Sequence, residues 1–350
     1  MWKLNPPSNK LLKWYVDTMC NNLINRIKTK KDSSGVPIIN STIKQILIPT
    51  KSDGTEDDTI LKKLLIEKPE ALYKLNNKLM KLIIHGYDDN EFETYLSVKK
   101  KKKRTVAETR LYNKYHNILE RLLNVFDYQG QIANNKERAY ALTIQQGHNT
   151  CTYCNRQYTI TIIKNGEHGD TSRIARPQLD HWFSKELYPL MSLSIYNLIP
   201  SCSICNSSVK GGAIFRLDTH IHPYLDSTSN EPSFRFSYRL NEANQYEVVI
   251  RNAYDIKEAN MIESLKLKEI YSYHGEIEVK DILKYNYQYS DAYLKTLLQG
   301  MLSHYKLSEV DIYRMLFGTE LETTNLLNRP LSKLKRDILM EIGILKDGKF

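Results

Sequence analysis

The sequence has no long apolar run: no stretch approaches the roughly 18 consecutive apolar residues that a membrane-spanning helix needs. Its start, MWKLNPP, lacks the charged and then apolar pattern of a secretory signal. Cysteine is scarce, and the odd number of five argues against the disulfide framework of a secreted protein. No internal repeat and no long low-complexity tract is present. We therefore expect a soluble, cytoplasmic protein that has no membrane partner.

Acidic residues are fewer than basic ones. Lys and Arg number 50 against 40 Asp and Glu, so the formal net charge is +10 with His neutral. This balance favours a polyanionic partner such as nucleic acid. Mutual repulsion predicts that the one block of consecutive cations is a solvated loop or helix end, serving either as a surface linker or as an arm that contacts phosphates. The block consists of Lys99, Lys100, Lys101, Lys102, Lys103 and Arg104.

Four of the cysteines form two Cys-x-x-Cys pairs, Cys151 with Cys154 and Cys202 with Cys205, and Cys20 is left over. Each pair can form a tight knuckle that supplies two thiolates, and two knuckles together close a tetrahedral Cys₄ zinc site. Such a clip is structural in most proteins. Taken alone, it would also suit an adaptor that binds nucleic acid or another protein.

Three further groups of residues accompany the cysteines: Asp180-His181, Asn197 and Asn206. In this order and spacing, residues 151–212 resemble the HNH endonucleases, and the resemblance does not extend over the rest of the 350-residue chain. It implies a ββα-metal core in which a distorted first strand carries Asp180 and His181. A loop then carries Asn197, and a helix carries Asn206 in the position of the last metal ligand.

The residue types suit phosphodiester hydrolysis, which needs an activated water and a Lewis acid at the phosphate. A neutral imidazole at His181 can accept a proton near pH 7, and Asp180 and Asn206 offer hard oxygens to Mg²⁺ or Mn²⁺. The resemblance implies these catalytic roles, a bracing role for Asn197, and a cut that leaves a 5′-phosphate and a 3′-hydroxyl.

Other polar residues near this core have several interpretations. His220 and His222 lie at i and i+2 on an extended segment, where they bind a metal, hold a phosphate or brace the core, and bracing is favoured. Several cations either hold the phosphate or face solvent. They are Arg156, Arg173, Arg176, Lys185 and Lys210.

Apolar periodicity and turn residues predict an α+β protein. Residues 1–147 form a mainly helical region, 148–255 the HNH nuclease core with zinc knuckles and hairpins, and 256–350 a second helical region. The predicted helices cover 9–30 (capped by Ser8 or Asn9), two or three segments within 59–125, 132–146, and most of 258–350, with a last helix at about 331–342. Residues 31–58 are predicted to be a loop. The predicted strands cover 156–164, a segment from about 174 to His181, 234–240 and 246–250, with a turn at Asn165-Gly166.

The sequence therefore predicts a metal-dependent HNH endonuclease that cuts DNA. The segment from Asn197 to Cys202 also resembles HNH subunits of bacterial anti-phage systems, of the Septu type or associated with retrons. That resemblance implies an effector restrained by a partner such as an ATPase. Two alternatives stay open: the same chemistry on RNA such as tRNA, and a catalytically silent zinc module that docks nucleic acid or a partner. The joint presence of Asp180, His181 and Asn206 argues against silence.

Overall fold

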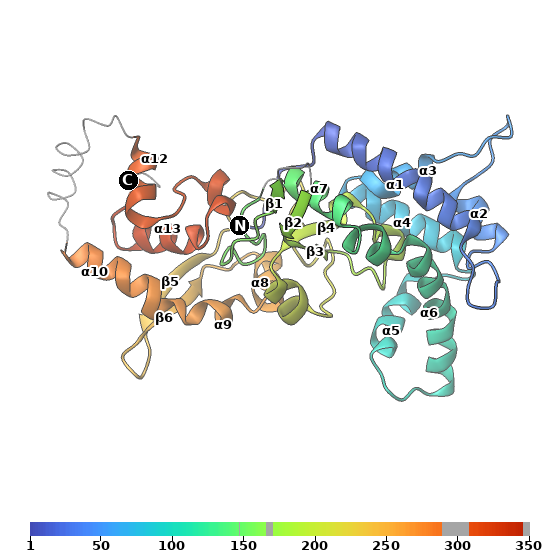
Figure 1. Cartoon of the computed structure of the whole chain (residues 1–350). Coiled ribbons are helices and arrows are strands. Elements are labelled where there is room, and N and C mark those ends of the chain that lie inside the picture. The colour runs from blue at the N-terminus through green and yellow to red at the C-terminus, as the bar shows by residue number, and fades with distance from the viewer. Residues whose placement is uncertain (147, 166–170, 289–307, 346–350) are drawn as a thin grey trace. The chain divides into compact units, whose positions relative to one another are not determined.

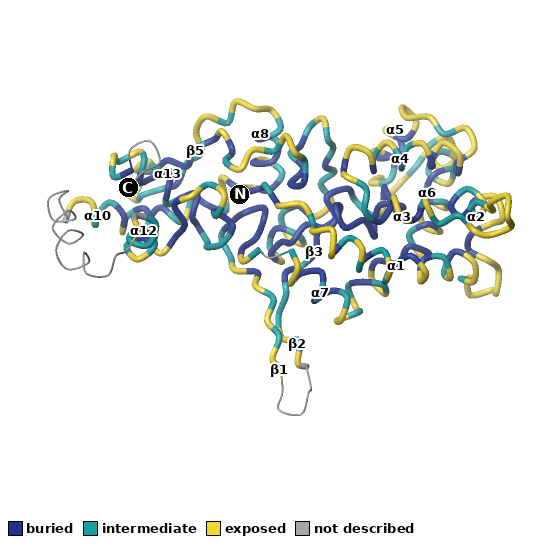
Figure 2. Tube along the Cα trace, turned by 90° about the horizontal axis from the view of Figure 1, so that it is seen from above, coloured by how far each residue is buried: buried dark blue, intermediate teal, exposed yellow. Residues whose placement is uncertain are grey.

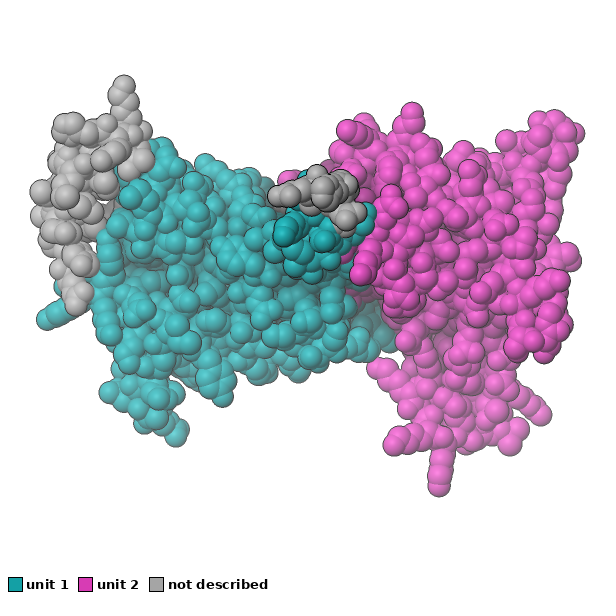
Figure 3. All heavy atoms as spheres, viewed as in Figure 1, with its two compact units in different colours: residues 1–4, 147–179, 200–350 teal, residues 5–146, 180–199 magenta. Residues whose placement is uncertain are grey.

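The computed structural model describes the chain except for residues 147, 166–170, 289–307 and 346–350. It forms two compact units, coloured separately in Figure 3. Unit 1 comprises residues 1–4, 147–179 and 200–350, and unit 2 comprises residues 5–146 and 180–199. Helices and two-stranded sheets occur together, so the predicted α+β class is confirmed at this level. The regions expected at 148–255 and 256–350 both contribute to unit 1.

Unit 2 is built mainly of amphipathic helices. α1 begins after Ser8, whose side chain accepts a hydrogen bond from the Leu11 amide, as the sequence predicted. Its buried face includes Tyr15 and Leu23, at helical spacing. The helices are α1 (Asn9–Thr29), α2 (Ser41–Leu47), α3 (Thr59–Ile66), α4 (Pro69–Ile83), α5 (Asp89–Lys99), α6 (Val106–Phe126) and α7 (Lys136–Gln146).

Three sequence-based expectations for unit 2 were wrong in detail. Residues 59–126 hold four helices, because Pro69 starts α4 and Asp88 caps α5. The expected loop 31–58 contains α2, which Asn40 caps. The helix expected from Ile132 begins at Lys136, because Asn135 accepts a hydrogen bond from the Arg138 amide and separates α7 from a short π-type turn, Gln129–Ala133.

The strands of unit 1 include two antiparallel hairpins. β5 (Arg235–Leu240) and β6 (Tyr246–Arg251) pair in register, as predicted. β1 (Ile162–Asn165) and β2 (Thr171–Ala175) form a largely exposed hairpin, seen in Figure 2. The predicted strand over 156–164 is wrong at its start, since β1 begins at Ile162. Of the predicted turn, Gly166 lies outside the described residues.

The strand expected from about residue 174 to His181 is two strands. β2 ends at Ala175, and β3 (Gln178–His181) follows Pro177, which has no N–H to donate to a continuous ladder. β3 pairs with β4 (Leu198–Ser201), and both strands contain residues of both units.

A short helical segment with π-type hydrogen bonding, Ile204–Lys210, follows β4. It ends at Gly211, where φ is 44°, a left-handed conformation that favours glycine. The sequence predicted this stop at Gly211-Gly212.

The C-terminal helices pack against the β5–β6 hairpin. Gly275 is required there, because a Cβ atom at this position would lie 2.0 Å from the Tyr246 carbonyl oxygen. Asp337 accepts a hydrogen bond from the Phe236 amide at 2.8 Å, which joins the last helix to β5. This helix confirms the prediction for 331–342. The helices are α8 (Ile256–Ser264), α9 (Leu267–Ser272), α10 (Lys280–Gln288), α12 (Glu309–Phe317) and α13 (Ser332–Glu341), with a π-type turn at Gly275–Val279.

Candidate functional site

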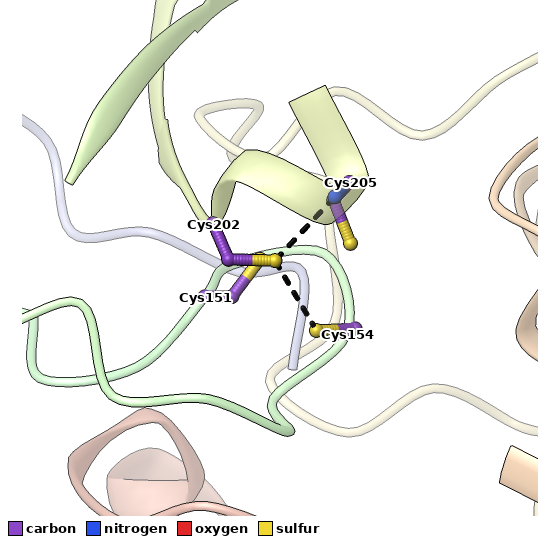
Figure 4. Close-up of side chains that lie close together, drawn as sticks. All are labelled: Cys151, Cys154, Cys202 and Cys205. Carbon is purple, nitrogen blue, oxygen red and sulfur yellow. Dashed lines mark hydrogen bonds between the residues drawn. The ribbon is translucent and has the colours of Figure 1, made fainter. Parts of the chain in front are cut away.

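The four cysteines of the two knuckles converge in unit 1 (Figure 4). All four are buried, and their sulfur atoms lie within 4.8 Å of one another. The Sγ atoms of Cys154 and Cys202 are 3.9 Å apart. A tetrahedral zinc site with Zn–S bonds of about 2.3 Å needs sulfurs about 3.8 Å apart. The cluster could therefore hold a metal ion such as zinc, as the spacing predicted.

The surroundings of the sulfurs favour a bound cation. The amides of Cys205 and Arg156 each donate to a sulfur, of Cys202 and Cys154 respectively, at 3.4 Å. Hydrogen bonds from Cys151 lower the pKa of both Cys154 and Cys202, whereas burial raises the pKa of Cys151. The hydrogen bond with Cys151 raises the pKa of Cys205. The thiols thus compete for negative charge, and a divalent cation would allow all four to ionise.

The first knuckle is held by residues from the C-terminal part of the chain. Asn155 adopts a left-handed conformation, with φ of 51°, and its side-chain Nδ2 donates to the Leu326 carbonyl oxygen at 2.8 Å. The Leu331 amide donates to the Asn155 carbonyl oxygen, and the Tyr271 hydroxyl donates to the Cys154 carbonyl oxygen. Sequence reasoning missed these contacts. The only local signal was an Asn, which tolerates the left-handed conformation, directly after Cys154.

A second constellation lies in unit 2, where Asp180 and His181 end β3 and are both buried. The His181 Nε2 atom lies 2.9 Å from the Ser192 carbonyl oxygen. Because a carbonyl oxygen only accepts, this contact assigns the proton to Nε2, and the lone pair of the neutral ring then lies on Nδ1. The Tyr128 ring meets the imidazole at 4.3 Å between centroids, nearly perpendicular at 81°. Ser192 and Tyr128 together fix the orientation of the ring.

Asn197 closes the loop that follows β3. It is fully buried, and its Oδ1 accepts from the Phe183 amide at 2.6 Å. Its Nδ2 donates to the carbonyl oxygens of Phe183 and Met191, both at 3.0 Å. Its own carbonyl oxygen accepts from the Trp182 amide. One side chain therefore joins the start of the loop to Met191, which directly precedes the Ser192 carbonyl that holds His181.

Asn206 is placed in unit 1, on the helical segment after β4. Its Nδ2 donates to the Gln178 side-chain oxygen at 2.8 Å. With the amide assigned this way, Oδ1 is the atom that Asn206 can offer to a metal. His181 ends β3, and Asn197 ends the loop region that follows it, both within unit 2, whereas the contacts of Asn206 lie within unit 1.

The predicted phosphate-binding cations differ in their surroundings. The Lys185 Nζ lies 5.5 Å from the Tyr128 ring centroid, next to the aromatic partner of His181. Arg156 donates to His274 at 2.9 Å. Arg176 donates to the Pro177 carbonyl oxygen. Lys210 is buried, with its Nζ 4.8 Å from the Phe215 ring.

His220 and His222 are buried, and both have specific contacts within unit 1. His220 stacks on Phe215 with centroids 4.5 Å apart and lies 3.2 Å from the Ser264 hydroxyl. His222 accepts from the Tyr224 amide. Burial lowers the pKa of His220 to about 4 and that of His222 to about 3. Both rings are therefore neutral at pH 7, and their contacts are those of bracing residues.

Of the helices in the described part of the chain, none combines the length and the apolarity needed to cross a bilayer. Comparison with models of protein families, with curated proteins and with solved structures gives no match to this chain.

Proposed function

We propose that the chain is a metal-dependent endonuclease of the HNH type that hydrolyses phosphodiester bonds of DNA. One observation carries the proposal: the hydrogen bond from His181 Nε2 to the Ser192 carbonyl oxygen. It makes Nδ1 the basic nitrogen of a ring held in one orientation at the end of a strand, directly after Asp180. A general base needs this combination of a lone pair and a defined direction.

The residues divide the chemical work as follows. His181 Nδ1 takes the proton of the attacking water, and the Ser192 carbonyl oxygen stabilises the resulting imidazolium through Nε2–H. Asn197 keeps the loop closed, so that Ser192 keeps its place. By the resemblance, Asp180 and Asn206 are each candidate ligands of Mg²⁺ or Mn²⁺. Such an ion, when bound, supplies Lewis acidity at the scissile phosphate.

The cysteine cluster has a structural role in this proposal. Four cysteine ligands complete the tetrahedral coordination of zinc and leave no position for water or substrate. β3, β4 and the helical segment Ile204–Lys210 follow one another in the order of a ββα core. Zinc between the knuckles would stabilise the start of that helical segment, which carries Asn206.

The proposed cellular role rests on sequence resemblance alone. The segment from Asn197 to Cys202 suggests an effector of a bacterial anti-phage system that a partner such as an ATPase restrains. RNA, including tRNA, offers the same phosphodiester chemistry. Parallel assays on plasmid DNA and tRNA, with and without Mg²⁺ or Mn²⁺, separate these substrates from each other and from a silent zinc module.

The decisive experiment is single-turnover cleavage of duplex DNA by His181→Ala. We expect the rate to fall by about 10²–10⁴-fold, because removing a general base removes help in the transition state only. Zinc content, folding and DNA binding should match those of the wild type. His85→Ala is the control, since His85 is an exposed histidine of unit 2 outside the site.

Two results would contradict the proposal. Cleavage by His181→Ala at the wild-type rate would show that His181 is not the general base. If the wild type cuts neither DNA nor RNA with either Mg²⁺ or Mn²⁺, the protein is not a nuclease of the proposed kind. Asp180→Ala should differ from His181→Ala by recovering part of its rate at high Mn²⁺, because it lacks a metal ligand rather than the base.

A further inference from the structure

The block of six cations in unit 2 begins at the last residue of α5 and continues as a loop. α5 ends at Lys99, and α6 begins at Val106 after a capping box formed by Thr105 and Glu108. Figure 1 shows this connection at the free end of the α5–α6 pair. The sequence predicted a solvated loop or helix end here, and the structure shows a helix end at Lys99 followed by a loop. It also divides the six side chains into two sets of three.

The first set is engaged within the protein. Lys99 forms an ion pair with Glu186, with Nζ and Oε2 2.7 Å apart, and Lys101 forms an ion pair with Glu108. The charges of these two lysines are therefore offset by carboxylates of unit 2.

Arg104 completes the engaged set. Its guanidinium donates to the carbonyl oxygens of Val98 and Lys99 at 3.1 and 2.9 Å, which satisfies acceptors at the C-terminal end of α5. The same group lies 3.8 Å from the centroid of the Tyr112 ring on α6. Arg104 thus ties both helices to the loop and limits the positions that the loop can take.

The second set points outward. Lys100, Lys102 and Lys103 are exposed, and within the described ranges of the chain none of the three forms an ion pair or a side-chain hydrogen bond. Three ammonium groups within four positions repel one another. The contacts of Lys99, Lys101 and Arg104 limit how far the loop can open to move these charges apart. An anionic partner of high charge density would remove the repulsion.

We propose that Lys100, Lys102 and Lys103 form a patch that binds the phosphate backbone of nucleic acid without reading its sequence. The choice of nucleic acid as the polyanion rests on the proposed nuclease function. Lysine contacts phosphate as a point charge, and these three lysines lie on a loop rather than on a helix or a two-stranded ribbon that enters the major groove. Loop residues 100–105 include no aromatic ring on which a base could stack. The patch therefore adds affinity for any sequence and is separate from the cleavage chemistry.

The test measures duplex DNA binding by filter or fluorescence titration across salt concentrations, in a His181→Ala background that prevents cutting. The test variant is Lys100→Gln/Lys102→Gln/Lys103→Gln. Removing three phosphate contacts should flatten the slope of log Kobs against log salt by about 2.7, with equal loss for unrelated sequences. The matched control, Lys10→Gln/Lys74→Gln/Lys78→Gln, removes the same charge from exposed lysines of unit 2 and should keep the slope.

Three other outcomes would contradict the proposal that these lysines bind the nucleic-acid backbone. An unchanged slope in the test variant means that these lysines do not contact DNA. Equal flattening in both variants means that only net charge matters. Loss of binding to phosphatidylserine vesicles with unchanged DNA binding would assign the patch to lipid. Because binding is measured without cleavage, a wild type that binds with the expected slope but never cuts contradicts the nuclease proposal and leaves the patch standing.

Discussion

The cysteine cluster of unit 1 and the histidine loop of unit 2 are held together by different means. In the cluster, four buried thiols from two distant segments lie within 4.8 Å of one another, and a bound cation would balance the charge of their thiolates. In the loop, Asn197 and backbone groups provide the hydrogen bonds, so it needs no added ion. Unit 1 should therefore depend on metal for its stability, whereas the loop should depend on one side chain.

Breaking the cluster should have the largest effect. Cys202→Ser removes one ligand, and structural zinc sites contribute about 10–16 kcal/mol of apparent binding free energy in small zinc peptides. We expect loss of the metal and unfolding of unit 1. Elemental analysis measures the metal content, and thermal unfolding measures the stability. Cys20→Ser, which changes a cysteine outside the cluster, should keep one zinc per chain. Soluble, folded wild-type protein that contains no zinc would contradict the expectation.

A smaller effect is expected from acid. In the folded state burial, and after it the charge of Lys210, lowers the pKa of His222 to about 3, against about 6.5 when unfolded. Below pH 6.5 the unfolded chain binds a proton that the folded chain excludes, so stability is present above pH 6.5 and is lost as the pH falls toward 3. The expected slope from this group is about 1.4 kcal/mol per pH unit.

Denaturant unfolding of wild type and His222→Gln at pH 7, 6 and 5 measures this slope. The variant should lose less stability per pH unit, while the contribution of zinc release is common to both proteins. His85→Gln, at an exposed position, should follow the wild type. Identical slopes for His222→Gln and wild type would show that His222 does not carry the effect.

The third effect concerns the loop that follows β3. Asn197→Ala leaves three buried backbone groups of Phe183 and Met191 without their partner, and each buried hydrogen bond is worth about 1 kcal/mol. We expect a loss of about 3 kcal/mol in unit 2, slower cleavage and unchanged zinc content. Asn113→Ala, on the exposed face of α6, is the control. Loss of zinc in Asn197→Ala would show that the two regions are not independent.

Local patterns in the sequence predicted several elements correctly. α1 has apolar residues at helical spacing after a Ser cap, and β5 and β6 alternate on either side of a turn. These features depend on neighbours in the chain. Pro177 was also a local signal, and its missing N–H explains why β2 and β3 are separate strands.

The residue types of the sequence by themselves determined which chemistry this protein can carry: four thiols in two knuckles, and Asp180-His181 with two asparagines. Tertiary structure decided how those groups are held. Ser192 contributes a backbone carbonyl, which any residue possesses, and Tyr128 reaches His181 from a distant segment. Lys99 differs from Lys100 because Glu186, far away in the chain, lies beside it. Contacts between distant residues and backbone groups leave no local pattern, because they depend on packing rather than on spacing.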